Sequence, residues 1–207
     1  MPSPQPKAVV LCSGGPASAT LCFLLGKKEG WFPSGSAAQS PSALRLALGL
    51  APEGYDLHLL AIQDGQRPYK QELSAIRLVA GLLGASFEVL NPAALTPLPS
   101  ILRSASHARL FTLAAVVAVR QGAMLVAAGM YSPYSAEESA AFVVRFNQAA
   151  QRGSTVPFFS PLRLMIPLAE FSLADLLALG QQLGGRWHTR GPVLKALRFR
   201  VAVAEIA

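Results

Sequence analysis

Short apolar runs alternate along the chain with longer stretches in which apolar residues recur at helical spacing. The expected strands cover residues 8–12, 57–62, 86–90 and 124–128, and the expected helices cover residues 18–27, 69–83, 109–121, 136–151 and 172–183. Buried strands that alternate with helices are typical of a parallel α/β sheet. We therefore predict one α/β domain over residues 1–207, a Rossmann-like parallel sheet with helices on both faces.

Two segments interrupt this alternation. Residues 30–54 are rich in Gly, Pro and Ser around an apolar patch at 44–48, and we expect a surface insertion with a short helix. A partner-binding lobe is the alternative, because long loops often carry function. Residues 91–106 contain three prolines and are expected to form a second long loop. Because ligands bind beyond the carboxyl ends of parallel strands, such loops should surround any site.

The helix expected at 172–183 carries its own start and stop signals. Ser172 is followed three residues later by Asp175, the pattern of an N-cap with a carboxylate that reaches back to it. Gly184 and Gly185 follow the last apolar position and are expected to end the helix.

Composition narrows the function classes. Apolar residues make up 52% of the chain and charged residues 14%, so burial can offset the entropy of ordering and the chain should be globular. Lysine and arginine number 18 against 11 acidic residues, giving a net charge of +7. A basic protein favours anionic ligands such as nucleotides or RNA. The basic cluster at residues 186–200 fits either a solvated helix face or a phosphate-contacting one.

Several classes are excluded at this stage. The longest apolar stretch, residues 110–130, is divided by Arg120, Gln121 and Gly122, so it falls short of the ~20 residues of a membrane span. The first residues lack the charged start and apolar core of a signal peptide, which predicts a cytoplasmic protein. Two cysteines are too few for a disulfide framework or a cysteine-based zinc site.

The sharpest local signal is the segment Ser13-Gly14-Gly15-Pro16-Ala17-Ser18, directly after the first expected strand. Glycines let backbone N–H groups approach an anion, and the N-terminus of the following helix adds a favourable dipole. We predict that Cys12, Ser13, Gly14, Gly15 and Ser18 line a phosphate site. The segment matches neither the Walker A loop nor the G-x-G-x-x-G fingerprint, and an ordinary glycine-rich turn is the alternative.

This segment resembles the PP-loop, Ser-Gly-Gly-x-Asp-Ser, of ATP pyrophosphatases. Nearly all the chain outside residues 30–54 is similar to the 7-cyano-7-deazaguanine synthase family of the queuosine pathway. The matching segments are residues 7–20, 54–67 with Gly65, Gln66 and Arg67, the helix around Arg109 and Leu113, 142–149, 159–162 and 191–207. The resemblance implies an adenine nucleotide alpha hydrolase-like fold, ATP with Mg²⁺ as cofactor, and a homodimer.

The chain also departs from that family. Where the family has the PP-loop Asp that helps to hold magnesium, this chain has Ala17, and a methyl group supplies no oxygen ligand. The change should weaken catalysis more than nucleotide docking. Gln63 replaces the Asp of the family's Asp-Tyr-Gly-Gln-Arg motif, and Asp64 stands at the Tyr position. Whether Asp64 restores a metal ligand stays open, because neighbouring strand positions point to opposite faces.

The family's zinc site and substrate segment are altered as well. No cysteine remains in residues 186–207, so we predict a C-terminal helix anchored by packing, with no zinc. We assign no residue of the chain as a metal ligand. The family's acidic substrate segment corresponds here to residues 129–136, which contain no acidic residue.

Three functions follow as hypotheses. The first is a diverged 7-cyano-7-deazaguanine synthase-like protein that binds an adenine nucleotide, with Gln66 in the pocket, and acts as a regulatory or scaffolding subunit beside a protein partner. The second is an active ATP-dependent ligase, an enzyme forming C–N bonds, with Asp64, Arg67 and Arg109 as catalytic residues. The third is an RNA-binding module, motivated by the positive charge. His58 is expected to be a satisfied core histidine, and Cys12 a buried small hydrophobe.

Overall fold

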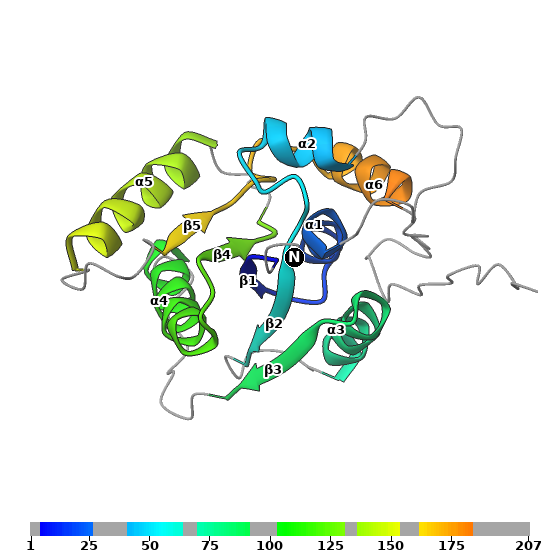
Figure 1. Cartoon of the computed structure of the whole chain (residues 1–207), viewed down its shortest axis with the longest axis horizontal. Coiled ribbons are helices and arrows are strands. Elements are labelled where there is room, and N and C mark those ends of the chain that lie inside the picture. Colours follow the sequence, from blue (N-terminus) through cyan, green and yellow to red (C-terminus); the bar gives the residue numbers. More distant parts are fainter. Residues whose placement is uncertain are drawn as a thin grey trace, which may run out of the picture.

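The computed structural model describes residues 5–26, 41–63, 70–91, 103–130, 136–153 and 162–183. Within them a five-stranded sheet runs in the order β3-β2-β1-β4-β5, and every neighbouring pair is parallel. The strands are β1 (Lys7–Leu11), β2 (Asp56–Ile62), β3 (Ser86–Leu90), β4 (Leu125–Ala128) and β5 (Arg163–Met165). The helices are α1 (Pro16–Gly26), α2 (Pro41–Ala47), α3 (Lys70–Leu83), α4 (Arg103–Gln121), α5 (Ala136–Gly153) and α6 (Leu173–Gln182). Figure 1 shows this arrangement.

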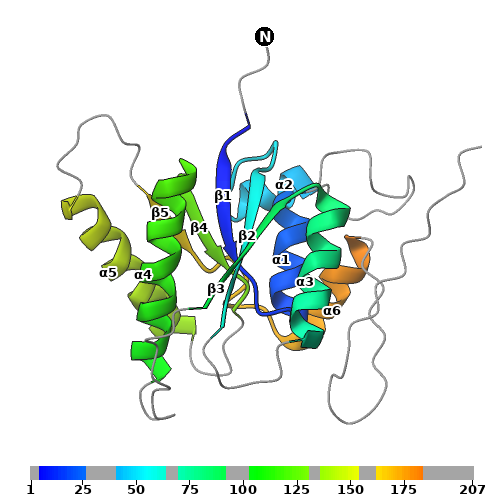
Figure 2. The same ribbon diagram turned by 90° about the horizontal axis from the view of Figure 1, so that it is seen from below.

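The predicted α/β Rossmann-like fold is therefore confirmed. Helices cover both faces of the sheet: α1, α3 and α6 lie on one side, and α4 and α5 on the other (Figure 2). Side chains alternate between the two cores along the central strand, since Val10 belongs to the core under α1 and Val9 to the core under α4. In the described part of the chain, no helix combines the length and apolar character needed to cross a bilayer.

Each of the four strands predicted from the pattern is present, with ends shifted by at most one residue. Two expectations were wrong. Helix α4 begins at Arg103, inside the segment 91–106 that we expected to be a loop. Strand β5 was missed, because three residues are too few to show a period. Its backbone is held by Asn147, whose side chain accepts from Leu164 N at 2.7 Å and donates to Leu164 O at 3.1 Å.

Helix α6 starts as its sequence predicts. The Ser172 hydroxyl accepts a hydrogen bond from Asp175 N at 3.2 Å, and the Asp175 carboxylate accepts one from Ser172 N at 3.1 Å. This reciprocal pair satisfies donors that have no partner inside the helix. The capping box thereby fixes the N-terminus of α6, the helix that packs against α1.

Helix α1 is buried all round, from Ala17 to Leu25. It packs against α6, α3 and α2 as well as the sheet. Apolar residues on every side, rather than on one stripe, are typical of such a central helix. The burial fixes the position of its N-terminus, which lies at the carboxyl end of β1.

The insertion has the expected short helix, α2, but its described part is not confined to the surface. Arg45 is fully buried, and its Nη1 donates a hydrogen bond to Pro52 O at 2.6 Å. Leu44 and Leu48 pack against the core under α1, whereas Leu46 is 67% exposed. The patch at 44–48 therefore divides between core and solvent. The expectation of a purely surface insertion is corrected for residues 41–54.

Candidate functional site

Residues 13–18, which we call the cradle loop, comprise the turn after β1 and the first three residues of α1, at the carboxyl edge of the sheet. Strand β1 lies between β2 and β4, so the strand order reverses at this point. The helix after β1 lies on one face of the sheet, and α5 after β4 lies on the other (Figure 2). Open α/β sheets bind their ligands at such a switch point.

Gly14 has a backbone conformation and surroundings that admit no side chain. Its φ is +73°, in the left-handed region that favours glycine. A Cβ at this position would lie 2.8 Å from both Cα and the carbonyl oxygen of Glu72, in the first turn of α3. The cradle loop is therefore wedged against the backbone of α3, and its path is fixed by that contact.

Gly15, in contrast, is not crowded by the residues that the structure describes. The nearest atom to an added Cβ is the hydroxyl of Ser13, at 3.4 Å. That hydroxyl also accepts the N–H of Gly15 at 3.4 Å, and Ser13 is exposed. Within the described part of the chain, the loop is therefore uncrowded at Gly15 and Ser13 and closely packed at Gly14.

The first turn of α1 completes the cradle loop. Ser18 donates its hydroxyl hydrogen to Gly15 O at 3.0 Å, and Ala19 N donates to the same carbonyl at 3.1 Å. Because Ser18 is buried, its side chain supports the turn from inside. First-turn N–H groups lack partners within their helix and attract anions. Pro16 contributes no N–H, but proline is tolerated at this position.

Gly129 packs against the cradle loop, a contact that the sequence analysis did not predict. A Cβ at Gly129 would lie 2.4 Å from Ser18 Cα and 2.5 Å from both Ala17 O and Ser18 N. The end of β4 therefore presses directly on the first turn of α1. The available signal was a glycine immediately after an expected strand, a position where a close backbone approach is common.

The other predicted site residues fall into three groups. Cys12 is buried beneath the loop, and its N–H donates to Leu60 O at 2.9 Å, extending the β1–β2 ladder. Arg109 is half-buried on α4, which covers the face of the sheet opposite α1. Asp64, Gln66 and Arg67 lie outside the described residues, as does the tail at 186–207.

A magnesium ligand is missing at the position where the PP-loop resemblance places one. Ala17 is 4% exposed, and its buried methyl group offers no oxygen. Among the residues that the structure describes, no group of three or more His, Cys, Asp or Glu side chains gathers to hold a metal. The backbone of the cradle loop suits an anion, whereas position 17 does not fit a magnesium ligand.

Comparison with known proteins supports the fold. No protein-family model matches the chain, and no curated protein matches it in sequence. Among solved structures, the U34-tRNA thiolase NcsA from Methanococcus maripaludis, with its 4Fe-4S cluster, matches at a TM-score of 0.50 and 13% identity, over 90% of this chain and 59% of the thiolase. PH1313 from Pyrococcus horikoshii Ot3 matches at 0.41 and 13%, over 86% of this chain and 41% of that protein.

The chain spans less than two thirds of either neighbour. The likeness to the thiolase supports the Rossmann-like, adenine nucleotide alpha hydrolase-like architecture. At 13% identity this likeness is evidence for the fold alone.

Proposed function

We propose that the chain binds an adenine nucleotide, with the triphosphate on the cradle loop, as a diverged relative of the 7-cyano-7-deazaguanine synthases with weakened or lost catalysis. The observation that carries the proposal is the shape of the loop. Gly14 packs against the backbone of α3, while no described residue crowds Gly15, at a helix N-terminus and a topological switch point. Backbone N–H groups placed in this way bind phosphate without a charged side chain.

Weak catalysis follows from Ala17. Phosphoryl and adenylyl transfer depend on positioned charge around the phosphates, and magnesium supplies much of it in related chemistry. Because Ala17 stands where the PP-loop has an Asp, the loop lacks one magnesium ligand, and nucleotide binding should depend little on added magnesium. The role that fits binding without turnover is a regulatory or scaffolding subunit, acting as a homodimer or with another protein.

A thermal-shift titration with ATP, with and without magnesium, tests the binding. A ligand that binds only the folded state stabilises it by RT ln(1 + [L]/Kd), about 2.7 kcal/mol at a hundredfold excess over Kd. We expect a saturable rise in Tm that persists when magnesium is chelated. An unchanged Tm at millimolar ATP would argue against the nucleotide site.

Gly15→Asp and Gly15→Asn make a matched pair for locating the nucleotide. Both side chains start in the same space, which no described residue crowds, and only the aspartate places a negative charge beside the bound phosphates. We expect Gly15→Asp to reduce ATP affinity at least tenfold, and Gly15→Asn to reduce it much less. Equal losses would show that bulk rather than charge matters, and unchanged affinity in both would place the nucleotide elsewhere.

Release of pyrophosphate separates this proposal from an active ligase. An ATP-dependent ligase that activates a carboxylate must release pyrophosphate when 7-carboxy-7-deazaguanine and ammonia are supplied. We expect none above background. Turnover that disappears in Asp64→Asn would instead support the ligase with Asp64 as a metal ligand.

A further inference from the structure

Two thiols lie in contact directly beneath the cradle loop. Cys12 immediately precedes the loop and Cys22 lies on α1, and their Sγ atoms are 3.4 Å apart. Cys12 is 7% exposed and Cys22 fully buried, and both are free thiols. They are the only two cysteines of the chain, so any internal disulfide must join this pair.

The two sulfur atoms need only a short movement to form a bond. A disulfide has an S–S distance of about 2.05 Å, which is roughly 1.3 Å shorter than the present contact. A cavity of about 10 Å³ adjoins both thiols and is also lined by Gly14, Ser18 and Leu59. This volume is close to that of one water-sized probe, so the side chains have limited space to turn. Two of the lining residues belong to the cradle loop.

We propose that Cys12 and Cys22 form a reversible disulfide that controls the cradle loop. Cys12 borders the loop and is the more accessible of the two thiols, 7% exposed against 0% for Cys22, so the oxidant reaches it first. Cys22 then acts as the resolving thiol. Its pKa is raised by the hydrogen bond with Cys12 and by burial, which keeps it a thiol until its neighbour is oxidised.

With hydrogen peroxide as the oxidant, the reaction is balanced. The Cys12 thiolate attacks one peroxide oxygen, forming a sulfenic acid and, after proton uptake, water. The Cys22 sulfur then attacks the sulfenic sulfur, the S–O bond breaks, and a second water leaves. The two thiols together lose two electrons and two protons, and the peroxide is reduced to two waters.

The bridge would act on the backbone of the cradle loop. It closes a ring that contains the whole loop and the first turns of α1. Gly14 packs closely against the backbone of Glu72, which limits movement of the loop toward α3. The N–H groups of the loop must therefore change direction. We expect ATP affinity to fall about tenfold, within the usual range of coupling between sites. This consequence rests on the proposed nucleotide site, whereas the disulfide itself does not.

Formation of the bridge is tested on the full chain by mass spectrometry. The protein is exposed to hydrogen peroxide, unfolded, alkylated and digested. We expect a linked peptide pair containing Cys12 and Cys22, no alkylation of either thiol, and full recovery with dithiothreitol. In Cys22→Ser, and in Cys22→Ala as a second variant, Cys12 lacks a resolving partner and should proceed to the sulfinic acid. Two fully alkylated thiols, or a sulfinic acid at Cys12 in the natural chain, would overturn the proposal.

The effect on the site is measured by ATP titration of reduced, bridged and Cys22→Ser protein. Reduced protein and Cys22→Ser should bind alike, and bridged protein about tenfold more weakly. Equal affinity in the reduced and bridged forms would contradict control of the loop. If no form binds ATP while the bridge forms, the nucleotide proposal fails and the disulfide stands as a modification site.

Discussion

The two edges of the sheet at which the strands begin and end, the amino edge and the carboxyl edge, are stabilised in different ways. At the amino edge, side chains from three elements satisfy one another. His58 Nδ1 lies 2.8 Å from Ser86 Oγ, and its Nε2 lies 3.3 Å from Glu88 Oε2. Arg120, near the end of α4, donates to the same carboxylate. At the carboxyl edge, the cradle loop is shaped by glycines, helix backbone and strand ends.

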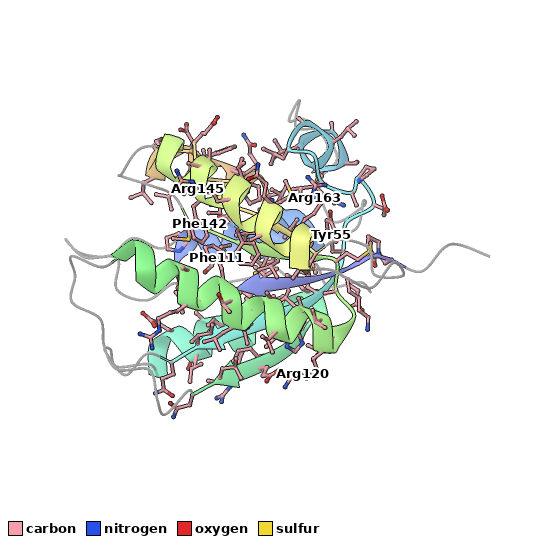
Figure 3. All side chains as sticks on the ribbon, turned by 90° about the vertical axis from the view of Figure 1, so that its left-hand side faces the viewer. Tyr55, Phe111, Arg120, Phe142, Arg145 and Arg163 are labelled. Carbon is pink, nitrogen blue, oxygen red and sulfur yellow. The ribbon has the colours of Figure 1, made fainter. Side chains whose placement is uncertain are left out.

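This difference separates a structural cluster from a binding site. Both ring nitrogens of His58 have partners inside the protein, so the histidine is the satisfied core residue that we expected. Buried polar groups that are fully hydrogen-bonded contribute to stability and leave little for a ligand. A loop at a helix N-terminus instead has donors that an outside anion can satisfy. The face of α4 turned to α5 is apolar, where Phe111 lies 5.3 Å from Phe142 between ring centroids (Figure 3).

The largest expected effect is at Gly14. Both Gly14 and Gly84 have positive φ, +73° and +63°, but an alanine Cβ meets backbone only at Gly14. Gly84→Ala should cost about 1 kcal/mol of left-handed strain. Gly14→Ala adds the clash with α3, for a total of about 2–4 kcal/mol. The free energy of unfolding in urea gives both values. Equal losses would mean that the wedge against α3 does not hold the loop.

The next effect concerns Glu88 and pH. The hydrogen bond from Arg120, followed by charge attraction and the contact with His58, lowers the pKa of Glu88 although burial opposes this. A lowered pKa stabilises the fold above the unfolded pKa, and that contribution is lost as pH falls through the folded value. Because Arg120 is 57% exposed, solvent screens the pair. Glu88→Gln should cost at most about 1 kcal/mol near pH 7.

Urea unfolding of Glu88→Gln and the natural chain at several pH values checks this sign. The difference between them should shrink as pH falls from the ordinary glutamate pKa, about 4.3, through the lower folded value. A difference that grows toward acid pH would contradict the lowered pKa.

The features that could be predicted from the sequence are those marked by a local repeat or by a local cluster of residues. Apolar periodicity located four strands, and adjacent glycines in one short segment located the cradle loop. Strand β5 escaped because three residues show no period, and its attachment depends on Asn147 of a distant helix. Gly129 and Glu72 touch the loop only after the chain has folded, since their contacts join positions far apart in sequence. The Cys12 and Cys22 thiols are only ten residues apart, but no repeat or local cluster in the sequence indicates their contact.

The smallest expected effect tests whether the two edges are independent. Arg120→Ala removes one exposed partner of Glu88 and should cost about 0.2–1 kcal/mol, a loss that shrinks in concentrated salt. Arg145→Ala, an exposed arginine of α5 (Figure 3), is the control for losing one positive charge. Neither variant should alter the Tm rise that ATP produces, because the cradle loop lies at the opposite edge. A weaker ATP response in Arg120→Ala alone would show that the amino-edge cluster supports the site through α4 and the sheet.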